Sequence, residues 1–210
     1  HYLNLKSMAR KGKKRNLKFS VAIIGEGFTE WYYFLNMRKT QRFGFEVKPS
    51  MPKHSDFRTI IATARRFRNE GYDLVFCVFD MDLILSNSSL KNLYLKEKSF
   101  HKINSGIYFI ESMPCFELWF LLHFMEKFSG KIFKSFKELK PELIKYIQDY
   151  QKSEQFFRNA GFYHYLENYG SVELAKKNAE KLLFEKQKQD NEFFNYTLMH
   201  QLLQHLEKMR

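Results

Sequence analysis

The chain has 210 residues, of which 44% are hydrophobic and 18% aromatic, so it can bury a substantial core and is not a disordered tail. Its formal net charge of +12 favours a polyanionic partner, such as a nucleic acid or an anionic membrane. The longest apolar stretch, residues 115–125, contains Glu117 and His123 and is too short to span a bilayer. The basic N-terminus also lacks the apolar segment of a signal peptide. We therefore expect a cytoplasmic protein without a membrane partner.

The basic charge is concentrated at the N-terminus. Residues 1–18 contain seven Lys or Arg residues and no acid, which is more than half of the net charge. A block of this kind is usually a solvated arm, and such arms often bind phosphates. Two interpretations remain open, a nucleic-acid contact and an inert tail. The candidate nucleic-acid-binding residues in the arm are Lys11, Lys13, Lys14 and Arg15.

Strand and helix patterns alternate from residue 19 to residue 128. Residues 74–79 form an entirely apolar run, as expected of a strand that is covered on both faces. The other predicted strands are residues 19–24, 43–47 and 107–110, and the predicted helices include residues 29–42 and 115–128.

One further helix is predicted after Asp56, which is expected to cap it. Apolar residues recur along this segment at helical spacing, from Phe57 to Phe67. The opposite face carries several arginines, of which Arg65 and Arg66 are further candidates for binding nucleic acid. An ordinary solvated helix face is the alternative.

The pattern changes to helices alone in the last part of the chain, from residue 136 to residue 210. We therefore predict three regions: a basic arm over residues 1–18, an α/β core over residues 19–128, and a helical region over residues 129–210 that packs on the core. Only Cys77 and Cys115 are present, so neither a disulfide scaffold nor a zinc site is indicated.

Acidic residues follow two of the predicted strands. Asp80 and Asp82 end the apolar run. Two residues at this spacing on a strand point to the same face, with their Cα atoms about 6.6 Å apart. Glu26 follows the first strand. Parallel sheets place their sites at the carboxyl ends of the strands, and Mg²⁺ prefers carboxylate oxygens. The pattern is typical of a metal-dependent phosphoryl-transfer centre, although acids in such turns also simply stop strands and cap helices.

Four segments together resemble the RloB-like proteins. VAIIGEGFTEWYYF (residues 21–34) is similar to their opening strand, acidic turn and helix, and VFCVFDMD (residues 75–82) is similar to their D-x-D strand. SMPCFELWFLLHF (residues 112–124) matches their aromatic signature almost position for position. NYTLMHQLLQHL (residues 195–206) is a weaker match to their closing motif. The resemblance extends over nearly the whole chain.

The resemblance implies a Toprim-like fold, with a mostly parallel four-stranded sheet flanked by helices. In Toprim enzymes a glutamate after the first strand acts as general acid or base, and a D-x-D pair binds Mg²⁺. Carried over to this sequence, Glu26 takes the first role and also joins Asp80 and Asp82 as a metal ligand. Glu30 and Glu117 match further acids of the family and complete the set of catalytic candidates.

Two positions differ from the family pattern. Gly25 stands where the family has cysteine, and apolar residues follow Asp82 where the family often has another acid. The second difference removes a ligand that a full two-metal site would use.

The resemblance also implies a function. RloB-like proteins occur in prokaryotic defence and restriction-associated loci, often beside a gene for an AAA- or ABC-type ATPase. We therefore expect a nuclease that depends on Mg²⁺ or Mn²⁺, cleaves DNA or RNA, and serves antiviral defence by abortive infection with an ATPase partner. A non-catalytic module that binds nucleic acid or docks the ATPase is the main alternative, and primase-like nucleotidyl transfer is a third.

Overall fold

The computed structural model describes residues 19–43, 46–51, 56–101, 105–127, 130–158 and 161–209. The basic arm, with the candidates Lys11, Lys13, Lys14 and Arg15, lies outside the described residues.

The core of the protein is a sheet with strand order β2-β1-β3-β4-β5. The first four strands are parallel, and β5 pairs antiparallel with the end of β4. The strands are β1 (Ser20–Ile24), β2 (Glu46–Ser50), β3 (Leu74–Asp80), β4 (Ile107–Met113) and β5 (Tyr196–Thr197).

The four parallel strands confirm the predicted α/β class. The prediction that only helices follow residue 136 is wrong, because β5 lies within that region. This strand has only two residues, and its register joins Ser112 to Thr197 and Met113 to Tyr196. A two-residue strand leaves no alternating pattern in the sequence, so its pairing depends on a distant partner. Of the second predicted strand, residues 43–47, Phe43 is not in a strand, residues 44–45 lie outside the described residues, and β2 extends beyond the prediction to Ser50.

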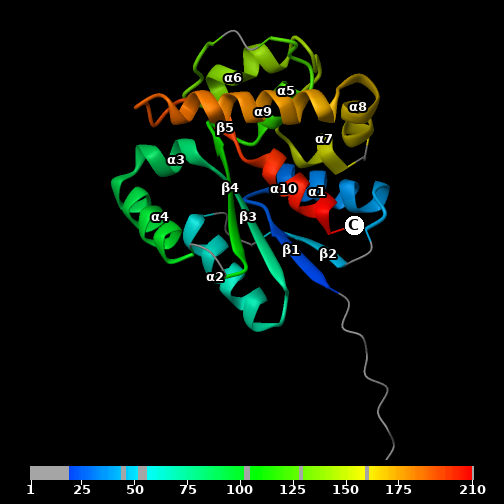
Figure 1. Ribbon diagram of the computed structural model, residues 1–210. Coiled ribbons are helices and arrows are strands. Elements are labelled where there is room, and N and C mark those ends of the chain that lie inside the picture. Colours follow the sequence, from blue (N-terminus) through cyan, green and yellow to red (C-terminus); the bar gives the residue numbers. More distant parts are fainter. Residues whose placement is uncertain are drawn as a thin grey trace, which may run out of the picture.

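Helices cover both faces of the sheet (Figure 1). Those of the first half are α1 (Phe28–Thr40), α2 (Phe57–Asn69), α3 (Met81–Ser86), α4 (Ser88–Phe100) and α5 (Glu117–Leu122). Those of the second half are α6 (Phe136–Leu143), α7 (Glu154–Arg158), α8 (Gly161–Tyr169), α9 (Val172–Gln187) and α10 (Met199–Lys208). The predicted helix over residues 115–128 is therefore shorter than expected, since α5 ends at Leu122.

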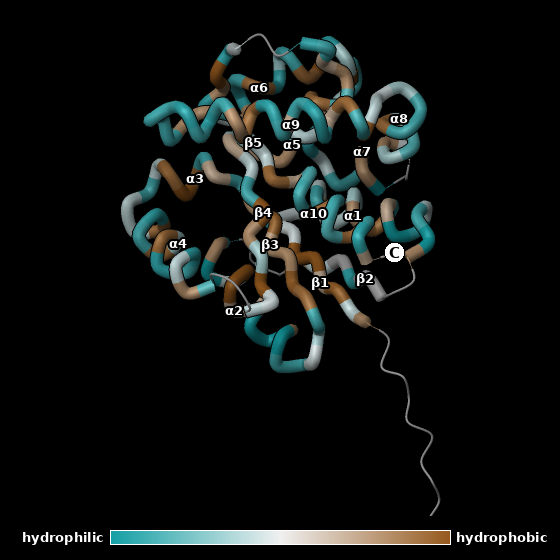
Figure 2. The backbone as a smooth tube through the Cα atoms, in the orientation of Figure 1, coloured by the Kyte–Doolittle hydropathy of each residue, from teal (hydrophilic) through white to brown (hydrophobic). Residues whose placement is uncertain are grey.

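Alternating side chains of the central strands enter two separate hydrophobic clusters. In β3, Phe76 and Val78 join one cluster, while Val75, Cys77 and Phe79 join the other. This alternation is the period of two that a strand imposes, and it explains why β3 is apolar from Leu74 to Phe79. The apolar strands run through the centre of the molecule in Figure 2, between helices that contain many hydrophilic residues.

One face of the sheet is covered by α2, α3 and α4. Helix α2 begins where the sequence predicts, because the Asp56 Oδ1 atom accepts a hydrogen bond from the Thr59 backbone N–H at 2.7 Å. Its buried residues are the apolar ones that recur at helical spacing, which confirms the predicted face.

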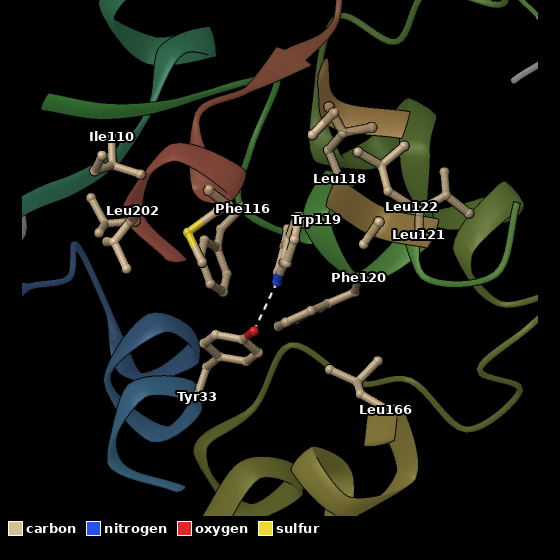
Figure 3. Packing of buried hydrophobic residues seen from close by; sticks show 14 of the residues in the cluster. Tyr33, Ile110, Phe116, Leu118, Trp119, Phe120, Leu121, Leu122, Leu166 and Leu202 are labelled. Carbon is tan, nitrogen blue, oxygen red and sulfur yellow. Dashed lines mark hydrogen bonds between the residues drawn. The ribbon is translucent and has the colours of Figure 1, made fainter. Parts of the chain in front are cut away.

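The other face carries α1, α5 and α10, and the same hydrophobic cluster continues into α6, α7, α8 and α9. Figure 3 shows its centre, where the Trp119 indole N–H donates to the Tyr33 hydroxyl at 2.9 Å. The cluster contains residues of both halves of the chain, so the helical half shares a core with the α/β half. In the view of Figure 1, α5, α6 and α9 lie above the end of β4. Among the described residues, no helix is long and apolar enough to cross a membrane.

Candidate metal centre

Acidic residues from separate strands meet at the carboxyl edge of the sheet. Glu26 follows β1, and its Oε2 atom accepts a hydrogen bond from the backbone N–H of Asp80 at 2.9 Å. Asp80 is the last residue of β3, and its Oδ1 atom accepts from the Phe116 backbone N–H at 2.8 Å. These two bonds hold the ends of β1 and β3 and the start of α5 together, as the sequence predicts for strand-end acids.

Asp82 lies on a different element from the one predicted. It is in the first turn of α3 rather than on the strand, so the expected same-face pair of Asp80 and Asp82 is wrong. Helix α3 begins directly after Asp80, and the Asp82 N–H, which has no partner within the first helical turn, donates to the Pro114 carbonyl at 3.2 Å. The half-buried Asp82 carboxylate accepts from the Leu83 N–H at 2.7 Å and remains close enough to raise the pKa of Glu26.

Glu117 is fully buried at the start of α5 and lies beside Asp80, as expected. One ligand atom from each of Asp80, Cys115 and Glu117 lies within 4.8 Å of the others. We call these three residues the inner triad. Cys115 was not among the predicted site residues, although it is part of the aromatic signature from which Glu117 was chosen.

The helical half contributes a lysine and a tyrosine that sequence analysis missed. The Lys152 Nζ atom lies 2.9 Å from Glu117 Oε1 and 4.0 Å from Asp80 Oδ2. The Tyr150 hydroxyl donates to the same Glu117 oxygen at 3.0 Å. Both residues belong to the polar segment between α6 and α7, which has no motif of its own. No local sequence signal could have assigned them to the site.

Glu30 lies in the first turn of α1, and its side chain is buried. Its Oε2 atom accepts a hydrogen bond from the Gly27 backbone N–H at 3.0 Å, so the carboxylate caps its own helix. Gly25 permits this position, because a Cβ atom at residue 25 would lie only 2.5 Å from the Glu30 Cβ. The glycine that replaces the family cysteine is therefore a requirement of the local packing.

Burial and mutual repulsion make the acids hard to ionise. Burial raises the pKa of Glu26, which the nearby Asp82 charge raises further, and burial likewise raises the pKa of Asp82. Burial and the charge of Glu30 raise the pKa of Asp80 well above its usual value. For Glu30, burial followed by the charge of Glu117 raises the pKa to about 7.

Lys152 is the cation that offsets this negative charge. Burial lowers its pKa, but the charges of Glu117 and Asp80 outweigh that effect and raise the pKa above its usual value. Five acids thus act on one another around Lys152, the one ammonium group that the described residues place beside them: Glu26, Glu30, Asp80, Asp82 and Glu117. An added cation would relieve the remaining repulsion.

The residues present fit a divalent metal. Glu117 Oε2 is buried and has no hydrogen-bond partner among the described residues. A buried polar atom without a partner is costly, and a cation beside it would remove that cost. The carboxylate oxygens of the cluster are the ligand type that Mg²⁺ and Mn²⁺ take.

The two predicted nucleic-acid-binding arginines of α2 do not join this cluster. Arg65 donates to Glu97 Oε2 at 2.6 Å, and Arg66 lies 3.6 Å from Glu70 Oε1. At a rise of about 1.5 Å per residue, Arg65 is roughly 13 Å along α2 from the N-terminal cap Asp56. Their part in nucleic-acid binding stays a prediction, and any contact they make would lie away from the acids.

The fold and the acid cluster define an α/β protein with a candidate metal centre at the carboxyl edge of its parallel strands. The family model of RloB-like proteins matches residues 21–206. The chain therefore belongs to the RloB-like protein family, as its motifs predict. No curated protein and no solved structure matches the chain.

Proposed function

We propose that this protein is a nuclease that depends on Mg²⁺ or Mn²⁺ and hydrolyses phosphodiester bonds of DNA or RNA. The observation that carries the proposal is that Glu26 and Asp80, at the ends of β1 and β3, meet Glu117, at the start of the helix after β4. One buried oxygen of Glu117 has no partner among the described residues. Burial raises the pKa of two of these acids, Glu26 and Asp80, and acids perturbed in this way are more typical of a catalytic centre than of helix caps.

Each residue of the centre has a part in this proposal. Asp80 and Asp82, with Glu26, would hold the metal, which when bound polarises the scissile phosphate and lowers the pKa of a water ligand. Glu26 accepts the proton of the attacking water, and its raised pKa brings it closer to neutral pH, where a general base is most effective. Lys152 is partly exposed and holds a phosphate oxygen against the acids, while Tyr150 fixes the Glu117 carboxylate.

The proposed partners follow from charge and family. The basic residues 1–18 would hold the phosphate backbone, and such contacts do not read sequence. Removal of residues 1–15 should weaken binding to nucleic acid and flatten its dependence on salt, because fewer counterions are released. An unchanged salt slope in filter-binding measurements would identify the arm as an inert tail. The proposed setting is a prokaryotic anti-phage system in which an AAA- or ABC-type ATPase acts with this chain.

The test compares cleavage of plasmid DNA, single-stranded DNA and RNA by the purified chain, with and without its genomic ATPase neighbour. We expect cleavage in Mg²⁺ or Mn²⁺ that stops with chelator and falls at least about 100-fold in Asp80→Asn. Glu185→Gln, on the exposed side of α9, is the matched control that keeps activity. Cleavage that survives in Asp80→Asn, or no metal-dependent cleavage by wild type with its ATPase, contradicts the proposal.

One observation favours the alternative of a non-catalytic module. Lys152 already lies between Asp80 and Glu117, and it offsets part of their charge without a metal. In that case the acids and Lys152 form a structural ion cluster that joins the two halves. A melting temperature that does not change with Mg²⁺ or Mn²⁺, together with retained nucleic-acid binding, would favour the module.

A further inference from the structure

The inner triad differs from the other acids of the centre because it contains a sulfur atom. Cys115 is 1% exposed and Glu117 is 0% exposed, and both follow β4, whereas Asp80 ends β3. One ligand atom of each residue lies within 4.8 Å of the others, so small side-chain movements would bring all three to one ion. The second cysteine, Cys77, is buried in the middle of β3 and belongs to a hydrophobic cluster.

Two hydrogen bonds hold the carboxylates of the triad in place. The Phe116 N–H donates to Asp80 Oδ1, and the Tyr150 hydroxyl donates to Glu117 Oε1. The Lys152 Nζ atom also lies 4.0 Å from Asp80 Oδ2 and 2.9 Å from Glu117 Oε1. The second oxygen of Glu117 has no partner among the described residues, although it is fully buried. This unpaired oxygen is the independent indication of a ligand, because cysteine and acids close together need not bind anything.

The donor set decides which ion would bind. Mg²⁺ demands a nearly octahedral shell of oxygen atoms and gains little from sulfur. Thiolate ligands select softer ions, and Zn²⁺ and Co²⁺ accept mixed shells of sulfur and oxygen. We propose that Asp80, Cys115 and Glu117 form an inner metal position that takes a thiophilic divalent ion such as Zn²⁺ in preference to Mg²⁺. Cys115 is the residue that sets this preference.

This proposal deepens the proposed metal centre and does not depend on nuclease activity. Asp80 would be shared between the oxygen-lined position formed with Glu26 and Asp82 and the inner position. As the sulfur binds, the thiol proton leaves to solvent. Lys152 lies 2.9 Å from Glu117 Oε1, so its ammonium group must move outward, which its 36% exposed side chain permits.

The test is a titration of the metal-free full-length chain with Co²⁺, followed by absorption. A thiolate ligand gives a sulfur-to-cobalt charge-transfer band in the near ultraviolet, which an oxygen shell does not give. We expect this band in wild type and in Cys77→Ala, the matched control on the other cysteine. We expect it to be absent in Cys115→Ser. Zn²⁺ should displace Co²⁺ from wild type, whereas Mg²⁺ in large excess should not.

The selectivity gives a second readout. Changing groups that merely support a metal ligand commonly costs 10–100-fold in affinity, so loss of the Cys115 sulfur itself should weaken Zn²⁺ binding at least about tenfold. Mg²⁺ binding by the same variant, measured by calorimetry, should change by less than about twofold, because Mg²⁺ gains little from a sulfur ligand.

Zinc-edge X-ray absorption of the wild-type protein needs no variant and therefore covers the case in which Cys115→Ser does not fold. A sulfur neighbour around zinc supports the inner position. A shell of oxygen and nitrogen alone, a wild type without the charge-transfer band, or a band that survives in Cys115→Ser overturns it. None of these readouts uses nucleic acid, so an inactive protein that binds Zn²⁺ through Cys115 would refute the nuclease and keep the inner position.

Discussion

Two buried glutamates on either side of the end of β4 have different surroundings. Glu111, on β4, accepts hydrogen bonds at both carboxylate oxygens: the Tyr94 hydroxyl and the Lys98 Nζ atom donate to Oε1 at 2.7 and 2.8 Å. The Tyr196 hydroxyl donates to Oε2 at 2.7 Å. Both carboxylate oxygens of Glu111 therefore accept hydrogen bonds.

Glu117 follows the same strand and also has one tyrosine and one lysine, Tyr150 and Lys152. Both of these donors reach Oε1, and Oε2 has no partner in the described part of the chain. Two further carboxylates, of Asp80 and Glu30, are close enough to act on this cluster electrostatically.

The difference separates a structural acid from a candidate functional one. A buried charge with all its hydrogen bonds made stabilises one arrangement of the chain, in this case the joining of α4, β4 and β5. A buried charge with an unused oxygen and acidic neighbours is a source of strain that a bound cation would relieve. Five predictions concern this distinction and the residues around it.

The largest effect is expected from neutralising each glutamate in turn. Glu111→Gln breaks a paired, buried charge and should lower the free energy of unfolding by about 2–4 kcal/mol. Glu117→Gln removes repulsion as well as an ion pair, so its unfolding free energy should stay within about 1 kcal/mol of wild type. Urea unfolding of the metal-free proteins measures both.

The response to metal should also distinguish these two variants, but here Glu117→Gln should be the one that is affected. Glu111→Gln should keep the rise of melting temperature with Mn²⁺, and Glu117→Gln should lose most of it. If Glu117→Gln is the more unstable variant and still responds to metal, Glu117 is the structural acid and the comparison is reversed.

The pH dependence of the unfolding free energy should show the raised pKa of Glu30. Its pKa rises from 4.5 to about 7 on folding, so the folded state holds the proton more tightly and is stabilised at acid pH. That contribution is lost as pH rises through about 7. Relative to Glu30→Gln, metal-free wild type should lose on the order of 3 kcal/mol between pH 4.5 and above 7. The measurement is the unfolding free energy of both proteins across this pH range. Equal slopes of unfolding free energy against pH would contradict the burial of an ionisable Glu30.

A glycine next to the acids should be intolerant of a methyl group. Gly25→Ala places a Cβ atom 2.5 Å from the Glu30 Cβ and should destabilise the protein by about 1–3 kcal/mol while displacing α1 from the centre. Gly161→Ala is the control, since, apart from its chain neighbours and the backbone of its own helix, no atom in the described part of the chain lies within 4 Å of its added Cβ, and it should change stability by less than about 0.5 kcal/mol. Equal effects of the two substitutions in urea unfolding would show that α1 can move away freely.

The smallest effect is expected from the two lysines. Lys98→Met should lower the unfolding free energy by about 1 kcal/mol, because Glu111 keeps both tyrosine donors. Lys152→Met should instead raise the affinity for Mn²⁺ several-fold, since the ammonium group no longer competes for Glu117 and Asp80. Scanning calorimetry measures the stability of Lys98→Met, and titration calorimetry measures the Mn²⁺ affinity of Lys152→Met. Weaker Mn²⁺ binding by Lys152→Met would mean that Lys152 organises the acids rather than competing with the metal.

Sequence patterns were sufficient for the acids that end or follow strands. Glu26 and Asp80 come after apolar runs, and parallel pairing of those runs necessarily brings their ends together. Asp82 was placed on the wrong element, because a strand and the first turn of a helix look alike where both are apolar. Cys115 was passed over, since two cysteines far apart in sequence form no metal-binding motif.

The sequence by itself determined the alternation of strands and helices, the cap of α2 and the family, because these depend on the periodicity of neighbouring residues and on contiguous motifs. Only the tertiary structure decided that Lys152 and Tyr150 reach Glu117, and that Glu111 is fully paired while Glu117 is not. These contacts join segments separated by helices, and packing in a shared core fixes them rather than any local preference. Whether a buried acid has all its hydrogen bonds depends on such distant partners, and the local sequence does not predict them.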